Sequence, residues 1–138
     1  MKHETEIICG ILKNSKSIAV YGISSNSSKI SRQIASFLKE KGYNVVGVNP
    51  SIDSAGNIEV YPNLRAIPHR IDIINVFRRS EEIPELINDT LHVHPAALWL
   101  QDGIRNDEAV KPIIEKGITV IQDKCIAVLY NHCKAING

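Results

Sequence analysis

The stretch Ser17-Ile-Ala-Val-Tyr-Gly22, followed by the polar residues Ser24-Ser-Asn-Ser-Ser-Lys29, decides the fold class of this chain. Its first part is a short apolar run that ends in glycine, which is typical of a strand buried on both faces. After the polar loop, apolar residues recur at helical spacing from Ile30 to Leu38, and Gly42 supplies a stop signal. A strand, a small-residue loop and a helix in this order predict the first unit of a parallel α/β sheet.

Four further apolar runs predict the other strands of this sheet. They are Asn44 to Val48, Asp72 to Phe77, Ala96 to Leu100 and Ile118 to Ile121. Helical patterns separate most of them, and Ser51 to Glu59 is expected to be a surface loop before a short turn of helix. Strands that alternate with helices predict one doubly wound α/β domain with a five-stranded parallel sheet. Right-handed crossovers make 3-2-1-4-5 the expected strand order.

Two more helices are expected at the ends of the chain. Apolar residues that share one helical face predict a short amphipathic helix within residues 1–14, and Ile126 to Cys133 predicts a final helix. Within the domain, Pro84 suits the first position of a helix and Asn106 suits an N-cap. Pro112 is expected to mark a kink or a restart of the helix that follows Asn106.

Length and composition limit what such a domain can be. The chain has 138 residues, of which 43% are hydrophobic and 22% charged. This length fits one domain over residues 1–138. A net charge of +1 favours neither nucleic acid nor another polyanionic macromolecule as a partner. Because no apolar run reaches the ~18 residues of a membrane span and the N-terminal segment is too polar for a signal peptide, we expect a soluble, cytoplasmic protein without a membrane partner.

The three cysteines are Cys9, Cys125 and Cys133. An odd count without CxxC spacing favours reduced thiols over a disulfide framework or a zinc site. Cys125 follows the predicted fifth strand beside Lys124, where a helix N-terminus would favour the thiolate. A small buried apolar residue is the alternative interpretation of Cys125.

Ligands of doubly wound sheets bind at the carboxyl ends of the strands, where the strand order reverses. For the expected order, this rule selects the loops Ile23 to Lys29 and Gln101 to Asn106. In the first loop, backbone N–H groups, a helix dipole and serine hydroxyls would converge, which is typical of an anion site. A plain polar turn with Ser28 as the helix cap is the alternative.

Two common phosphate ligands fit this loop poorly. The nucleoside triphosphatase loop G-x-x-x-x-G-K-[ST] is absent from the chain. The dinucleotide fingerprint G-x-G-x-x-G would place Ser24 and Ser27 at its second and third glycines. In place of the acidic residue that binds the ribose hydroxyls, the second strand ends in Asn49-Pro50. These departures argue against NAD.

An ordered set of short motifs carries a family resemblance. The motifs are Ala19-Val-Tyr-Gly-Ile-Ser24, Val46-Gly-Val-Asn-Pro50, Asn75-Val-Phe-Arg-Arg-Ser80, Leu98-Trp-Leu-Gln101 and Asp123-Lys-Cys125. In this order they resemble the stand-alone CoA-binding proteins. These are small Rossmann-like domains, similar to the CoA-binding domain of the succinyl-CoA synthetase α subunit. The resemblance covers residues 15–125.

The resemblance implies coenzyme A as the ligand and, by position, a set of contacts. Gly22, Ser24, Ser25 and Asn26 would wrap the pyrophosphate, and Lys29 stands where the family usually has arginine. The nucleotide end and the other wall would be formed by Asn49, Pro50, Phe77, Arg78, Gln101, Gly103 and Asn106. Arg32 and Arg79 are further candidate cations, although Arg79 is expected to face solvent or to pair with Glu81 or Glu82.

The sequence predicts binding of CoA or an acyl-CoA without catalysis by the chain itself. No serine or cysteine nucleophile has an identifiable base, and His92 and His94 precede the fourth predicted strand, away from the expected ligand edge. We therefore predict no catalytic residue and no metal site. Two alternatives stay open, an NAD(P)-dependent enzyme and the CoA-binding subunit of a split acyl-CoA synthetase with a separate protein partner. A further hypothesis is that Cys125 forms a mixed disulfide with CoA.

Overall fold

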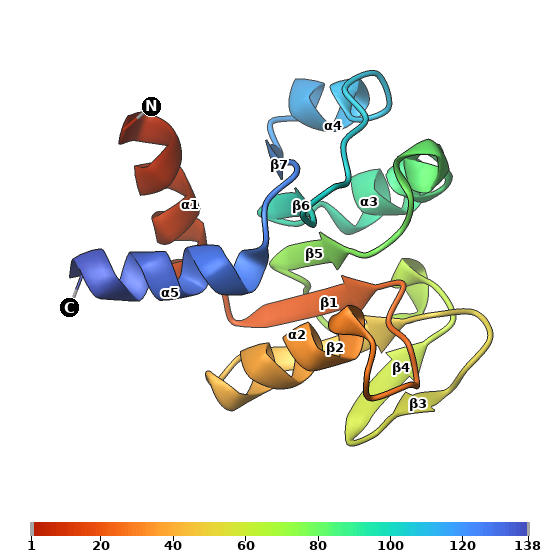
Figure 1. Ribbon diagram of the computed structural model, residues 1–138. Coiled ribbons are helices and arrows are strands. Elements are labelled where there is room, and N and C mark those ends of the chain that lie inside the picture. The colour runs from red at the N-terminus through yellow and green to blue at the C-terminus, as the bar shows by residue number, and fades with distance from the viewer. Residues whose placement is uncertain (1, 138) are drawn as a thin grey trace.

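A seven-stranded sheet runs through the computed structural model, which describes residues 2–137 (Figure 1). The strands are β1 (Ser17–Tyr21), β2 (Asn44–Val48), β3 (Ser54–Ala55), β4 (Ile58–Tyr61), β5 (Ile73–Val76), β6 (Ala97–Leu100) and β7 (Thr119–Ile121). They lie in the order β3-β4-β2-β1-β5-β6-β7. The pairings are parallel except in the short β3–β4 hairpin.

The α/β class and the Rossmann-like arrangement are confirmed, but the predicted five-stranded parallel sheet is wrong. All five predicted strands form, and residues 51–59, expected as a loop, contribute β3 and the start of β4. Because β4 pairs in parallel with β2, it occupies the place beside β2 that the expected order 3-2-1-4-5 gave to the third predicted strand, so this order is wrong. The predicted third strand, β5, therefore lies on the other side of β1. When the six parallel strands alone are numbered along the chain, so that β4 becomes the third, their order is 3-2-1-4-5-6. This is the strand order of dinucleotide-binding domains.

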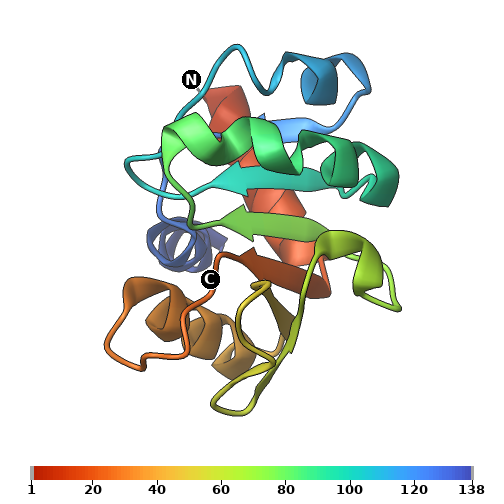
Figure 2. The ribbon, with the colours of Figure 1, turned by 90° about the vertical axis from the view of Figure 1, so that its right-hand side faces the viewer.

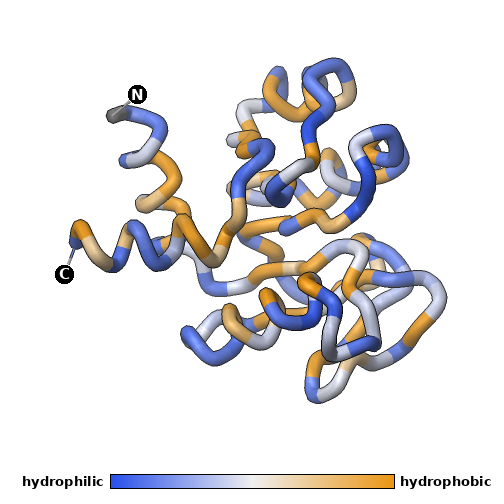
Figure 3. Tube along the Cα trace, viewed as in Figure 1, coloured by the Kyte–Doolittle hydropathy of each residue, from blue (hydrophilic) through white to orange (hydrophobic). Residues whose placement is uncertain are grey.

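Helices cover both faces of the sheet (Figures 1 and 2). One face packs against α1 (Lys2–Asn14), α2 (Ile30–Glu40) and α5 (Ile126–Asn137), and the other against η1 (Leu64–Ala66), η2 (Ser80–Leu86), α3 (Ile87–Val93) and α4 (Lys111–Glu115). Along β1, Ile18 and Val20 face the first core and Ala19 the second. The buried strands consequently form continuous hydrophobic runs (Figure 3). Within residues 2–137, no helix is long and apolar enough to cross a bilayer.

The local helix predictions have mixed outcomes. The helical turn expected around residues 62–67 forms as η1, and both terminal helices form, the last one extending beyond its predicted end. Pro84 lies inside η2 instead of at a helix start. Of the kink or restart expected at Pro112, the restart is confirmed: α4 begins at Lys111 after a turn, and Pro112 lies in its first turn, where a missing N–H needs no partner. Asn106 caps a turn by accepting a hydrogen bond from Ala109 N, and α4 begins only after that turn.

The expectation of three reduced cysteines is wrong. Cys9 of α1 and Cys133 of α5 form a disulfide, with Cα atoms 5.5 Å apart and a sequence separation of 124. The two cysteines meet because the terminal helices pack together on one face of the sheet, which cysteine count and spacing cannot reveal. Cys125 is a free, half-buried thiol.

Candidate functional site

A crevice lies at the carboxyl ends of β1, β5 and β6, where the strand order reverses. Its volume is about 560 Å³, within the range of small-molecule sites. Among the predicted contacts, those that line it are Gly22, Ser24, Lys29, Phe77, Arg78, Gln101 and Gly103. In the observed order the reversal lies between β1 and β5, so the rule that ligands bind there selects the loops after these two strands. The loop after β6 lines the crevice beside them. Applied to the sequence alone, the rule missed the loop after β5 because that strand was misplaced.

The floor of the crevice is a close approach of two loops at Gly22. This residue has φ +89°, and a Cβ there would lie 2.8 Å from Phe77 O and 3.0 Å from Arg78 Cδ. Gly22 N donates to Val48 O at 2.8 Å, and Phe77 N donates to Tyr21 O at 2.8 Å. Both backbone conformation and space therefore require glycine at this position.

Side chains of α2 hold the loop after β1. Ser24 N donates to Ser31 Oγ at 3.0 Å, and Arg32 Nη1 donates to Ser25 O at 2.7 Å. Arg32, a candidate cation in the sequence, thus supports the loop. The backbone N–H of Ser25 finds no acceptor among the described residues. A fixed loop with an open N–H beside a helix N-terminus is an arrangement that binds phosphate groups.

The N-terminus of α2 carries no side-chain cap. The helix begins at Ile30 with Lys29 in the N-cap position, whose side chain makes no capping hydrogen bond. The alternative of Ser28 as the cap is wrong, since its hydroxyl donates to Asn26 Oδ1 at 2.8 Å. An uncapped terminus leaves first-turn N–H groups available to an anion.

One carboxylate organises the two arginines of the crevice. Arg78 Nε lies 3.1 Å from Glu82 Oε1, and Arg79 Nη2 lies 3.3 Å from Glu82 Oε2, as expected for Arg79. These two hydrogen bonds hold the pKa of the Glu82 carboxyl below its ordinary value, and the bond to Glu82 raises the pKa of Arg78. Glu82 therefore holds both arginine side chains in place beside the crevice.

Five of the predicted contacts do not line this crevice. They are Ser25, Asn26, Asn49, Pro50 and Asn106. Asn49 Nδ2 donates to Ile23 O at 2.8 Å, which ties the end of β2 to the first loop. Asn106 Nδ2 donates to Ser80 O at 2.9 Å, which ties together the loops after β6 and β5. Both asparagines thus maintain the shape of the crevice.

Gln101 lines the crevice, but its side chain is turned into the protein. Its Oε1 accepts hydrogen bonds from Asn75 Nδ2 at 3.2 Å and from Ile126 N at 3.3 Å. These bonds attach the start of α5 to the sheet beneath the crevice. Gly103 N donates to Asp123 Oδ1 at 2.7 Å, which fixes the loop after β6 in a similar way.

Sequence reasoning missed Gly47 and Ser31. A Cβ at Gly47 would lie 2.6 Å from Ile23 Cγ2, so this glycine seats the first residue of the β1–α2 loop. A glycine inside a strand pattern signals such a close approach and could have identified it. Nothing local in the sequence connects Ser31 with Ser24. Cys125 does not line the crevice. Its reaction with CoA stays a prediction.

Comparisons with known proteins identify the family. The family model described as "CoA binding domain" matches residues 16–131. The chain is 40% identical over 120 residues to the uncharacterised protein YneT of Bacillus subtilis (strain 168), covering 87% of this chain and 89% of that protein.

Solved structures agree with this match. A Thermus thermophilus protein is 30% identical with a TM-score of 0.89, covering 94% of this chain and 98% of that chain. The dinucleotide-forming acetyl-coenzyme A synthetase 1 of Ca. Korarchaeum cryptofilum is 25% identical with a TM-score of 0.67, covering 76% of this chain but 25% of that one. The resemblance seen in the sequence motifs is confirmed: the chain belongs to the family of CoA-binding domains.

Proposed function

We propose that this chain binds coenzyme A or an acyl-CoA in the crevice at the carboxyl ends of β1, β5 and β6. The observation that carries the proposal is the backbone floor at Gly22 beside the uncapped N-terminus of α2. This arrangement suits a pyrophosphate, which CoA carries together with a 3′-phosphate. Membership of the CoA-binding domain family supports CoA over other phosphate ligands.

In the proposed complex, the pyrophosphate lies against the loop after β1 and accepts a hydrogen bond from Ser25 N. Lys29 and Arg78 supply positive charge, and Arg78 is held for this task by Glu82. Gly22 lets the ligand approach the backbone. The remaining predicted site residues complete the set, as direct contacts or as supports of the loops: Ser24, Asn26, Asn49, Pro50, Phe77, Gln101, Gly103 and Asn106.

We propose that the chain binds this ligand without chemistry of its own. Among the described residues that line the crevice, there is no histidine or cysteine to serve as base or nucleophile. This chain covers only 25% of the similar acetyl-coenzyme A synthetase, so most of that synthetase has no counterpart here. This favours, as a second candidate, a CoA-binding subunit that works with a separate partner protein. We also propose the cytoplasm as the location of this chain, where a structural disulfide such as Cys9–Cys133 is rare.

Calorimetric titration with CoA, acetyl-CoA, NAD, NADP and ATP tests the proposal. We expect CoA or acetyl-CoA to bind most tightly. In a separate unfolding measurement, ligand at 100 times its Kd should raise the free energy of unfolding by ~2.7 kcal/mol. Lys29→Gln should weaken CoA binding about tenfold, because a charge-assisted contact to phosphate is lost. Lys116→Gln, an exposed lysine beyond the crevice, is the matched control. Binding of NADP without binding of CoA would favour the nicotinamide alternative.

A further inference from the structure

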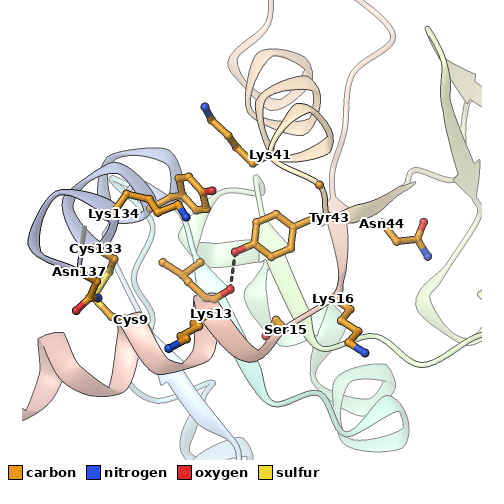
Figure 4. A pocket seen from close by; sticks show the side chains of 13 residues that line it. Cys9, Lys13, Ser15, Lys16, Lys41, Tyr43, Asn44, Cys133, Lys134 and Asn137 are labelled. Carbon is orange, nitrogen blue, oxygen red and sulfur yellow. Dashed lines mark hydrogen bonds between the residues drawn. A yellow bond between two sulfur atoms is a disulfide. The ribbon is translucent and has the colours of Figure 1, made fainter.

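A second cleft lies at the opposite end of the sheet, where β1 and β2 begin (Figure 4). Its volume is about 610 Å³. The walls come from α1, from Ser15 and Lys16 before β1, from residues 41–44 before and at the start of β2, and from α5. The proposed CoA crevice lies at the carboxyl ends of the same sheet. The two hollows share no lining residue.

Four lysines surround this second cleft. They are Lys13 of α1, Lys16, Lys41 and Lys134 of α5 (Figure 4). Among the residues that the structure describes, none of the four forms an ion pair and no Asp or Glu lines the cleft. Positive charge therefore gathers along this cleft, although the whole chain carries a net charge of only +1. The carboxylate of Asp72 lies at one edge, where it accepts a hydrogen bond from Lys16 N at 2.8 Å.

Aromatic side chains form the inner part of the cleft. Lys134 Nζ lies 6.0 Å from the centre of the Tyr130 ring, and Tyr43 meets Tyr130 edge to face at a centroid distance of 6.1 Å. The Tyr43 hydroxyl donates to Leu12 O (Figure 4). Burial and the neighbouring Tyr130 raise the pKa of Tyr43 to about 12, so it stays neutral and brings no negative charge to the cleft.

A covalent bond holds two walls of the cleft together. The Cys9–Cys133 disulfide joins α1 to α5, the helices that supply Lys13 and Lys134 (Figure 4). A ligand between these lysines therefore meets a site whose walls are already in place. Such preorganisation lowers the entropy cost of binding.

We propose that this cleft is a second ligand site, which takes a phosphorylated small molecule. Four lysines whose side chains form no ion pair among the described residues favour a polyanion over a neutral or cationic ligand. The volume is that of a small-molecule site, which favours a metabolite over a stretch of nucleic acid or protein. The tyrosine rings offer an apolar surface for the part of the ligand that carries no charge. This proposal does not rest on CoA binding in the crevice, since the two hollows share no lining residue.

Titration of the ¹⁵N-labelled full chain with inorganic pyrophosphate, followed by NMR, tests this site. We expect saturable shifts of the backbone amides of Ser15, Gly42 and Tyr43 at ~0.15 M ionic strength. The double variant Lys13→Gln/Lys134→Gln should weaken binding about tenfold or more. The matched control is Lys111→Gln/Lys116→Gln, which removes the same charge from exposed positions on and next to α4 and should leave the affinity unchanged within about twofold.

Pyrophosphate can also enter the crevice, so the titration is repeated with Lys29→Gln. This variant should leave the shifts at Ser15, Gly42 and Tyr43 intact, whether or not the chain binds CoA. Shifts confined to crevice amides such as Gly22 and Ser24 would overturn the proposal. An equal loss of affinity in both double variants would also overturn it, because it would show a general charge effect. The absence of saturable shifts would have the same consequence.

Discussion

At the scale of single residues, Gly22 combines a fold requirement with a ligand requirement. Its φ is +89°, and Phe77 O lies only 2.8 Å from where a Cβ would stand, so there is no room for a side chain. We expect Gly22→Ala to lower the free energy of unfolding by ~1–3 kcal/mol and to weaken CoA binding. Urea unfolding and CoA titration measure the two effects. Gly10→Ala in α1 is the control, since a Cβ there meets nothing within 4 Å; an unchanged urea midpoint for Gly22→Ala would contradict the prediction.

The sequence predicted the residues at the crevice better than it predicted their tasks. Gly22, Lys29 and Arg78, which the family resemblance implied as site residues, line the crevice, and their contact with CoA stays a prediction. Asn49 and Gln101 were also expected as ligand contacts. Their amides make hydrogen bonds within the protein, and their contact with CoA stays a prediction. A side-chain amide looks the same in a sequence whether it faces a ligand or a backbone carbonyl, so only the tertiary structure separates the two tasks.

At the scale of elements, Asp72 joins the starts of β1 and β5. Its Oδ2 accepts hydrogen bonds from Lys16 N at 2.8 Å and Ser17 N at 3.2 Å, and its Oδ1 accepts from Arg70 Nε at 3.0 Å. Partial burial raises the pKa of Asp72, but these hydrogen bonds outweigh burial and leave the pKa below its ordinary value of 3.8. The ionised group therefore stabilises the fold above about pH 3.8, and this contribution is lost as the pH falls through the lowered pKa.

We expect Asp72→Asn to destabilise the fold by ~1 kcal/mol at pH 7, because an amide accepts weaker hydrogen bonds than a carboxylate. The difference from the unchanged protein should shrink as the pH falls below 3.8 and through the lowered pKa of the folded state, because the carboxyl then becomes protonated. Urea unfolding at several pH values measures it. Asp53→Asn, at an exposed position before β3, is the control. A destabilisation of the same size at pH 2 and pH 7 would contradict a role for the charge.

The sequence could not show the β3–β4 hairpin, and this omission disturbed the predicted strand order. In β4, burial alternates between Ile58, Glu59 and Val60, but a pattern of four residues is too short to separate a strand from a loop. Gly56, with φ +64°, turns the hairpin and lies against the guanidinium of Arg32. The pairing of β4 with β2 and the contact of Gly56 with Arg32 of α2 form only in the assembled fold. The longer apolar runs needed no such support, and all of them were predicted as strands.

At the scale of the whole molecule, a near-neutral composition conceals two regions at opposite ends of the sheet where cationic side chains gather, one of which also holds the acids Glu81 and Asp102. One is the crevice with Lys29 and Arg78, and the other is the cleft with Lys13 and Lys134. Net charge averages over both, so it argued against polyanionic macromolecules as partners but said nothing about local anion sites. The topology brings the charges together, because parallel strands place all loops of one kind at the same end.

The Cys9–Cys133 disulfide acts on the whole chain, since it joins positions separated by 124 residues. Closing so long a loop restricts the unfolded state, so we expect reduction or Cys9→Ser/Cys133→Ser to lower the free energy of unfolding by ~2–4 kcal/mol. Urea unfolding with and without a reducing agent measures this, and mass spectrometry after alkylation counts the free thiols. Cys125→Ser is the control, and it should keep the response to the reducing agent. If all three cysteines are alkylated in protein purified without reductant, the disulfide is absent, and the expected stabilisation is absent too.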